Sequence, residues 1–212
     1  MRGLLYKHFR TIAKEMWSFL LLCAVFYAVA FFAPGMEGNT TAIYGMLMMS
    51  MVITSLLRSD ETTGWRRYCE LLPISRKEVV TSYYLVNYGM LTGAILLYIV
   101  LMSLGKVWRG SADLQNVFST ALVMVAVSFL LSALSIPITL KFGSVKGPAI
   151  HFAVTFMIVG VGISLLNNGD KMVETVAGMP LAITGLIMIA VTAAAVLLSW
   201  MISVRVYEKK EY

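Results

Sequence analysis

The sequence predicts an all-α membrane protein with six transmembrane helices. Hydrophobic residues make up 59% of its 212 residues and charged residues only 13%, a balance typical of an integral membrane protein. A helix needs about 20 mostly apolar residues to cross the hydrocarbon core of a bilayer. The stretches that meet this requirement are residues 17–34, 40–57, 81–104, 117–140, 149–166 and 179–203. They leave no room for a soluble domain, so residues 1–212 are expected to form a single transmembrane domain.

Residues 2–15, which precede the first span, are expected to form an interfacial helix. Apolar residues recur there at helical spacing, at Leu5, Phe9, Ile12 and Met16. The basic residues mark another face, with Lys7, Arg10 and Lys14. A helix of this kind lies in the headgroup layer, with its apolar face toward the acyl chains. The alternative is a basic N-terminal tail without helical order.

Span two is rich in methionine and in small hydroxyl side chains. Thioethers are flexible and polarizable, which suits a surface that contacts varied apolar partners, and small polar groups can line a helix interface. We therefore select Met46, Met49, Ser50 and Thr54 as candidates for a surface that faces cargo or a second copy of the chain. The alternative is that these side chains fill gaps between helices of the same chain.

Residues 59–72, between spans two and three, are expected to form a short amphipathic helix. Ser59 can cap its first turn, where Asp60 and Glu61 are favoured by the helix dipole. An apolar face follows from the helical spacing of Trp65, Tyr68 and Leu72. An ordinary solvated loop is the alternative.

Later positions mark the boundaries and contacts of the following helices. Pro73 ends the amphipathic helix, and Ser75 with Glu78 forms a capping box that opens the next one. Gly89-x-x-x-Gly93 in span three permits close approach of another helix, and packing within the chain is the preferred interpretation. Pro137 predicts a kink or an early helix exit near the end of span four.

The distribution of basic residues predicts the orientation. Fourteen of the 17 Lys and Arg residues fall on one side of the predicted spans, and only Lys106, Arg109 and Lys171 fall on the other. Cytoplasmic loops carry the excess of Lys and Arg, so both termini are expected to be cytoplasmic. The net charge of +6 follows from this bias and from contact with anionic lipid, and it gives no reason to expect a nucleic-acid partner.

The sequence also argues against several functions. The centres of the predicted spans hold no Asp, Glu, Lys or Arg, which disfavours an ion-coupled carrier, although sodium sites built from backbone and hydroxyl oxygens need no carboxylate. A phosphate-binding loop of the form G-x-x-x-x-G-K-[ST] is absent. The two His and two Cys residues are isolated from one another. We therefore expect neither an enzyme nor a bound cofactor or metal.

The segment after span two resembles the ABC-2 type membrane permeases of bacteria, especially their compact branch of about six spans. The residues that carry the resemblance are Glu61, Gly64–Trp65, Tyr68 and Leu72–Pro73–Ile74–Ser75–Arg76. The resemblance implies a coupling helix that docks in a groove of a separate ATP-binding cassette subunit, where ATP and magnesium bind. The candidate docking residues are Asp60, Glu61, Trp65, Arg66, Tyr68 and Leu72. It also implies an elbow helix at residues 2–15, a second permease copy or a paralogue as partner, and a bacterial inner-membrane location.

Two functional hypotheses follow. The first is the permease subunit of an ATP-driven exporter of hydrophobic or amphipathic peptides, because the compact branch includes exporters of bacteriocin-like and phenol-soluble-modulin-type peptides. The second is a membrane scaffold or immunity protein that binds a cytoplasmic partner without moving a solute. Either would use an amphipathic helix between two spans.

Overall fold

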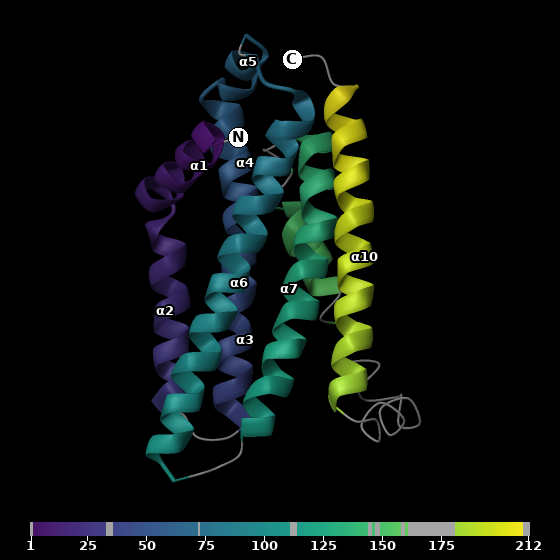
Figure 1. Ribbon diagram of the computed structural model, residues 1–212. Helices are drawn as coiled ribbons and strands as arrows, with labels where there is room; N and C mark the ends of the chain where they lie inside the picture. Colours follow the sequence, from purple (N-terminus) through teal and green to yellow (C-terminus); the bar gives the residue numbers. More distant parts are fainter. Residues whose placement is uncertain are drawn as a thin grey trace.

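The computed structural model of the protein describes residues 2–32, 36–71, 73–110, 114–143, 149–157 and 181–209, together with Lys146 and Gly160. Within these ranges every regular element is helical (Figure 1). The labelled helices are α1 (Arg2–Glu15), α2 (Trp17–Phe32), α3 (Met36–Ser50), α4 (Val52–Thr62), α5 (Trp65–Glu70), α6 (Arg76–Trp108), α7 (Leu114–Phe142) and α10 (Leu181–Glu208). A further helical segment covers residues 149–157. The predicted all-α fold is confirmed.

The long helices run side by side in one bundle, and the start of α1 and the end of α10 lie at the same end of it (Figure 1). We call this the terminal end of the bundle. It also carries α5 and the start of α6, and the side chain of Arg76 on α6 donates to the backbone oxygen of Glu208 at 2.7 Å. At the opposite end, Arg109 donates to the backbone oxygen of Phe31, which joins the ends of α6 and α2.

Four stretches among the described residues are long and apolar enough to cross a membrane. They are Asn39–Thr62, Arg76–Trp108, Leu114–Phe142 and Ile183–Glu208. Helix α2 has only 16 residues, and α1 with α2 would make a fifth candidate that bends by 69° between them. The predicted span 149–166 lies partly outside the described residues. The protein is therefore polytopic, and the count of six spans stays a prediction.

Helix α6 begins and ends as its sequence indicates. Ser75 and Glu78 form the predicted capping box, since the Glu78 N–H donates to Ser75 Oγ at 3.2 Å and the Ser75 N–H donates to Glu78 Oε2 at 3.1 Å. Gly110 follows the helix with a φ of 70°, a conformation that costs glycine little. Of the two alternatives expected at Pro137, an early helix exit is wrong, because α7 continues through that residue to Phe142, and a kink stays a prediction.

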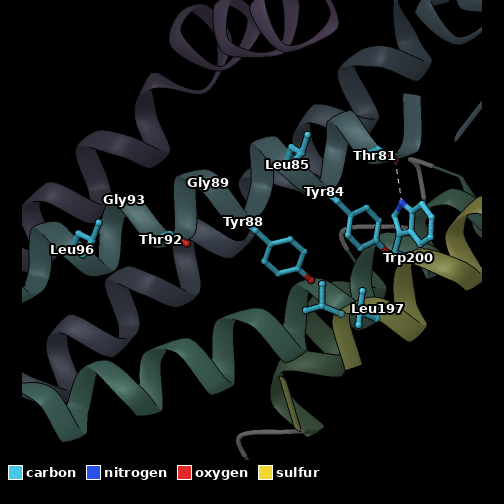
Figure 2. Close-up of a pocket in the computed structure, with 11 residues that line it drawn as sticks. Thr81, Tyr84, Leu85, Tyr88, Gly89, Thr92, Gly93, Leu96, Leu197 and Trp200 are labelled. Atoms are coloured by element: carbon cyan, nitrogen blue, oxygen red, sulfur yellow. Dashed lines mark hydrogen bonds between the residues drawn. The ribbon is translucent and has the colours of Figure 1, made fainter. Parts of the chain in front are cut away.

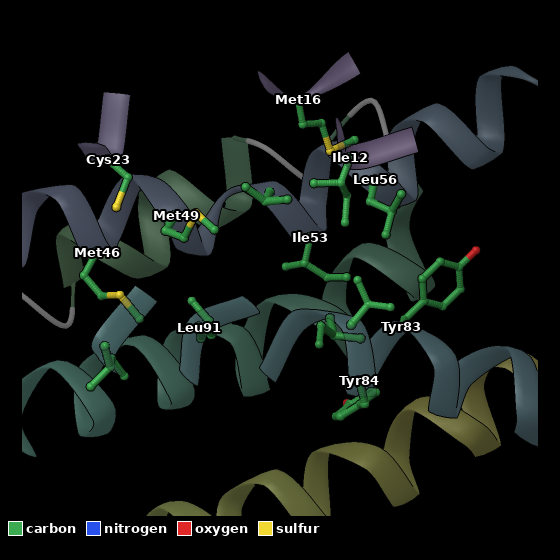
Figure 3. Packing of buried hydrophobic residues seen from close by; sticks show 14 of the residues in the cluster. Ile12, Met16, Cys23, Met46, Met49, Ile53, Leu56, Tyr83, Tyr84 and Leu91 are labelled. Carbon is green, nitrogen blue, oxygen red and sulfur yellow. The ribbon is translucent and has the colours of Figure 1, made fainter. Parts of the chain in front are cut away.

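The four candidate side chains of span two lie inside the protein. Met46, Met49, Ser50 and Thr54 are all buried, the two methionines within the cluster of Figure 3. The cause is the position of α3, which carries the first three and packs against α2, α6 and α7. Thr54 lies on α4, which also packs against α7. The Tyr27 hydroxyl donates to the Met46 sulfur at 3.7 Å, and the Ser50 hydroxyl donates to the Leu47 backbone oxygen at 2.6 Å. Gap filling within the chain therefore describes these residues, and they offer no surface in this protomer for cargo or a second copy.

The N-terminal helix α1 buries one face against the bundle and exposes Phe9 on another. Leu4, His8, Ile12 and Met16 follow one another at intervals of four residues and are buried against the bundle. Phe9 points elsewhere and is 60% exposed, next to the exposed basic residue Arg10. The prediction that Phe9 and Ile12 share a membrane-facing surface is therefore wrong. The exposed Phe9 is the side chain on α1 that suits contact with lipid.

A charge at position 9 is expected to weaken the contact of α1 with lipid. Phe9→Glu should lower the affinity of the helix for lipid by about 2 kcal/mol, because the phenyl ring that it removes would no longer be buried among acyl chains. Thr11→Glu is the control, since Thr11 lies between Lys7 and Lys14 in the sequence of this helix. The measurement is the reaction of a cysteine at exposed Tyr6 with a water-soluble thiol reagent in vesicles. Equal reaction rates in both variants would contradict the interfacial position.

Candidate functional site

The segment after span two folds as two helices, and the predicted single helix over residues 59–72 is wrong in its start. Residues 59–62 continue α4, and the Thr63 N–H donates to the Ser59 backbone oxygen at 3.0 Å. Gly64 then takes a φ of 71°, which ends α4 and allows α5 to start in a new direction at Trp65. The signal that could have shown this break is Gly64 itself, since glycine commonly follows a helix C-terminus.

Asp60 is consequently a buried residue of α4 and not part of an exposed docking surface. Its carboxylate is 1% exposed. One oxygen pairs with the Lys7 ammonium of α1, and the other accepts a hydrogen bond from the Tyr83 hydroxyl of α6 at 2.6 Å. A buried carboxylate is tolerable only when it is paired and hydrogen-bonded, and both conditions hold here. Asp60 therefore joins α1, α4 and α6 at the terminal end of the bundle.

His8 completes this group, which we call the Asp60 node (Lys7, His8, Asp60 and Tyr83). The Ser82 hydroxyl donates to the Val79 backbone oxygen at 2.7 Å and is hydrogen-bonded with His8 Nε2 at 3.1 Å. His8 Nδ1 has no hydrogen-bond partner among the described residues and lies 3.8 Å from Asp60 Oδ2. Burial lowers the pKa of His8 to about 4, although Asp60 opposes the shift, and Lys7 adds to it. His8 is therefore neutral near pH 7.

Lys7 also connects the Asp60 node to α5. Its ammonium lies 4.5 Å from the centre of the Trp65 ring, a distance at which a cation is attracted to the face of an indole. The Trp65 and Tyr68 rings are 5.5 Å apart and tilted by 37°. A second link joins α4 to α1, where the Ser59 hydroxyl donates to Glu15 Oε2 at 2.7 Å. The position of α5 is therefore coupled to that of α1.

Two large apolar side chains are exposed on α5 and directly after it. Tyr68 is 53% exposed, and Leu71, which directly follows the helix, is 82% exposed. Trp65 is only partly exposed because Lys7 and Tyr68 cover it. We call Tyr68 and Leu71 the α5 surface. Leu71 was not among the predicted docking residues, although its place next to Leu72 on a short amphipathic segment was a signal.

Of the other predicted docking residues, only Glu61 has a described side chain. Glu61 is exposed and lies against the end of α7, where a β-carbon added to Gly143 would be 3.2 Å from Glu61 Oε1. Leu72 and the side chain of Arg66 are outside the described part of the chain. The structure thus brings Trp65 and Tyr68 together, places Asp60 inside the bundle, and directs Glu61 toward a different helix.

These features define a class: an all-α polytopic membrane protein that carries a short amphipathic helix between two spans at one end of its bundle. The chain matches the family model of the ABC-2 family transporter proteins over residues 3–208, and it belongs to that family. It is therefore a permease component, the transmembrane subunit of an ABC transporter, whose partner is an ATP-binding subunit. No curated protein matches the sequence.

Proposed function

We propose that the protein is the permease of an ABC exporter and that the α5 surface is its docking site for the ATP-binding subunit. The observation that carries this proposal is the exposure of Tyr68 and Leu71 on an element held by Lys7. Exposed aromatic and apolar anchors on a rigid element are typical of a protein interface. ATP and magnesium bind on the partner subunit under this proposal, which makes the present chain a non-catalytic component.

The coupling mechanism follows from the contacts of α5. When ATP closes the partner subunits, they move α5, and α4 moves with it because only Thr63 and Gly64 separate the two helices. The Asp60 node transmits the displacement to α1 and α6 through Lys7 and Tyr83. The spans then rearrange against a second permease copy or a paralogue. The proposed coupling consists of helix movements and involves no covalent change in this chain.

The terminal end of the bundle faces the cytoplasm in this proposal. It carries most of the described basic residues, on α1, α4, α6, α7 and α10, as the positive-inside rule requires. The membrane is then the inner membrane of a bacterial cell. Cargo of hydrophobic or amphipathic peptides fits spans without charged centres better than a strongly charged solute does.

Cysteine labelling in intact cells is expected to confirm this orientation. Trp108→Cys, at the 81% exposed end of α6, should react with a membrane-impermeant thiol reagent, whereas Leu71→Cys should react only after the cells are opened. The native Cys69 is unsuitable as a reporter because its side chain is buried, and burial also raises the pKa of its thiol. Reaction of Leu71→Cys in intact cells would reverse the orientation.

The test of the function uses the α5 surface. Tyr68→Ala and Leu71→Ala should each weaken binding of the ATP-binding subunit by about 2 kcal/mol, roughly 30-fold, because interface anchors of this type dominate binding free energy. Binding is measured by co-purification from membranes, together with cargo-stimulated ATP hydrolysis in vesicles. Trp108→Ala is the matched control, an exposed aromatic residue at the opposite end.

The alternative function is a scaffold or immunity protein that binds a cytoplasmic partner and moves no solute. It predicts the same loss of partner binding in the Tyr68→Ala variant. It predicts no vectorial movement of peptide into or out of vesicles when both subunits and ATP are present. Transport by the reconstituted complex therefore separates the two functions.

A further inference from the structure

An apolar groove runs along the outer side of the bundle between α6 and α10 (Figure 2). Its volume is about 760 Å³, and its walls include Tyr84, Tyr88, Leu85 and Leu197. Figure 2 shows the two tyrosine rings directed from α6 toward α10, with Gly89 and Gly93 further along α6. Both helices face outward over much of their length. In an apolar stretch of 18 residues, only 28% is buried in α6 and 17% in α10. The groove therefore opens to the surroundings of the bundle.

Apart from Thr92, the polar side chains of the groove walls are hydrogen-bonded within the protein. The Tyr84 hydroxyl lies 2.6 Å from Ser199 Oγ and 2.8 Å from Ser203 Oγ. The Tyr88 hydroxyl donates to the Phe129 backbone oxygen at 3.4 Å, and the Trp200 indole N–H donates to Thr81 Oγ1 at 3.1 Å. These walls offer ring faces and aliphatic carbon to an occupant. An occupant of the groove is consequently apolar along most of its length.

The two glycines leave space for this occupant. A β-carbon built on Gly89 or on Gly93 would meet no atom of the described chain within 4 Å. The preferred interpretation of Gly89-x-x-x-Gly93, packing against another helix of the same chain, is therefore wrong for the described residues. A side chain at either position would instead project into the groove region.

One end of the groove is basic. Trp200 and Thr81 lie toward the terminal end of the bundle, and an indole ring with a polar edge suits the level of the lipid headgroups. The exposed Lys77 comes one helical turn before Thr81, whose hydroxyl donates to the Lys77 backbone oxygen at 2.7 Å. Arg205 is exposed further along α10. Two acidic residues lie at the same end: Glu78, whose carboxylate accepts the Ser75 N–H, and the exposed Glu208.

We propose that this groove is a binding site for an anionic phospholipid. An acyl chain lies along Tyr84, Tyr88 and the two glycines, and the phosphate lies beside Lys77 and Arg205. The apolar walls fit the chain, and the exposed cations in the first turn of α6 and the last turn of α10 fit the negative headgroup. The site concerns α6 and α10 and does not depend on the docking of α5. It assigns to the protein a lipid ligand beyond its transport cargo.

The test is native mass spectrometry of the purified full-length protein with phosphatidylglycerol and phosphatidylcholine added in turn. The wild type should bind phosphatidylglycerol more tightly. Lys77→Gln and Arg205→Gln should each weaken that binding by about fivefold and leave phosphatidylcholine unchanged, because each cation near a negative headgroup contributes on the order of a fivefold preference. Lys209→Gln, which removes another exposed cation at the same end, is the control.

A second pair of variants tests the groove itself. Gly89→Leu fills it and should lower the binding of both lipids at least fivefold, whereas Leu97→Phe, which adds bulk at an exposed position outside the groove lining, should not. Equal lipid binding by wild type, Gly89→Leu and the two charge variants would overturn the proposal. Loss of a protein dimer in Gly89→Leu with unchanged lipid binding would also overturn it, and would assign the groove to a second copy of the chain.

Discussion

Lys7→Met is expected to lower the free energy of unfolding by about 3 kcal/mol, because it leaves the Asp60 carboxylate buried without its ionic partner. Asp60 is held inside the bundle by helices α1, α4 and α6, so the carboxylate cannot turn toward water without moving α1. Lys7 itself keeps 24% of its side chain exposed, which limits the desolvation that its own charge experiences. The measurement is chemical unfolding of the detergent-solubilised protein at pH 8.

A double variant separates the charge effect from packing. Lys7→Met with Asp60→Leu removes both charges and should recover most of the loss, since replacing a buried ion pair with apolar residues is often neutral. Tyr83→Phe, which removes only one hydrogen bond to Asp60, should cost about 1 kcal/mol and serves as the milder comparison. If the single and double variants are equally unstable, Lys7 contributes through packing alone.

The same node predicts a pH dependence of defined sign. The pKa of His8 is about 4 in the folded protein, against an ordinary histidine value of 6.5, so the unfolded chain binds more protons between these values. The free energy of unfolding of the wild type should therefore fall as the pH is lowered from 6.5 toward 4. In Lys7→Met, the His8 pKa should rise, and protonated His8 can pair with Asp60. The difference in the free energy of unfolding between variant and wild type should be smaller at about pH 5.5 than at about pH 8.

Gly45→Leu is the second large effect, with an expected loss of about 3 kcal/mol or more. A β-carbon on Gly45 would lie 2.8 Å from the β-carbon of Phe26 on α2 and 3.5 Å from the Tyr27 ring. The β-carbon of Phe26 is attached directly to the backbone and cannot swing aside. Helices α2 and α3 must therefore separate to admit any side chain, which opens the core around Met46.

The matched control for this variant is Gly93→Leu. Gly93 also lies inside a long helix, but a β-carbon there would meet no described atom within 4 Å. The free energy of unfolding of Gly93→Leu should lie within about 1 kcal/mol of the wild-type value, since only the helix propensity at this position changes. The readout is thermal aggregation monitored by size-exclusion chromatography. A similar loss in both variants would show that helix propensity, and not contact with Phe26, sets the result.

Local chemistry explains why parts of the fold could be predicted from the sequence. The long apolar runs had to be membrane helices, because backbone groups in a bilayer must be hydrogen-bonded within the segment. The Ser75–Glu78 capping box involves residues only three positions apart, so its contacts could be predicted without the rest of the fold. The break at Gly64 was also a local feature, but the acidic residues before it favoured a helix start over a helix end.

The class of the protein, a helical and polytopic chain with an amphipathic segment between two spans, therefore follows from the sequence alone. Which of its residues lie inside depends on contacts between distant helices. Asp60 finds Lys7 at a separation of 53 positions and Tyr83 at a separation of 23. Met46 is buried while Leu97 is exposed, although both lie in apolar helices. A span that is apolar on every side has no periodic pattern to distinguish a lipid-facing side chain from a core one, so packing between helices makes that choice.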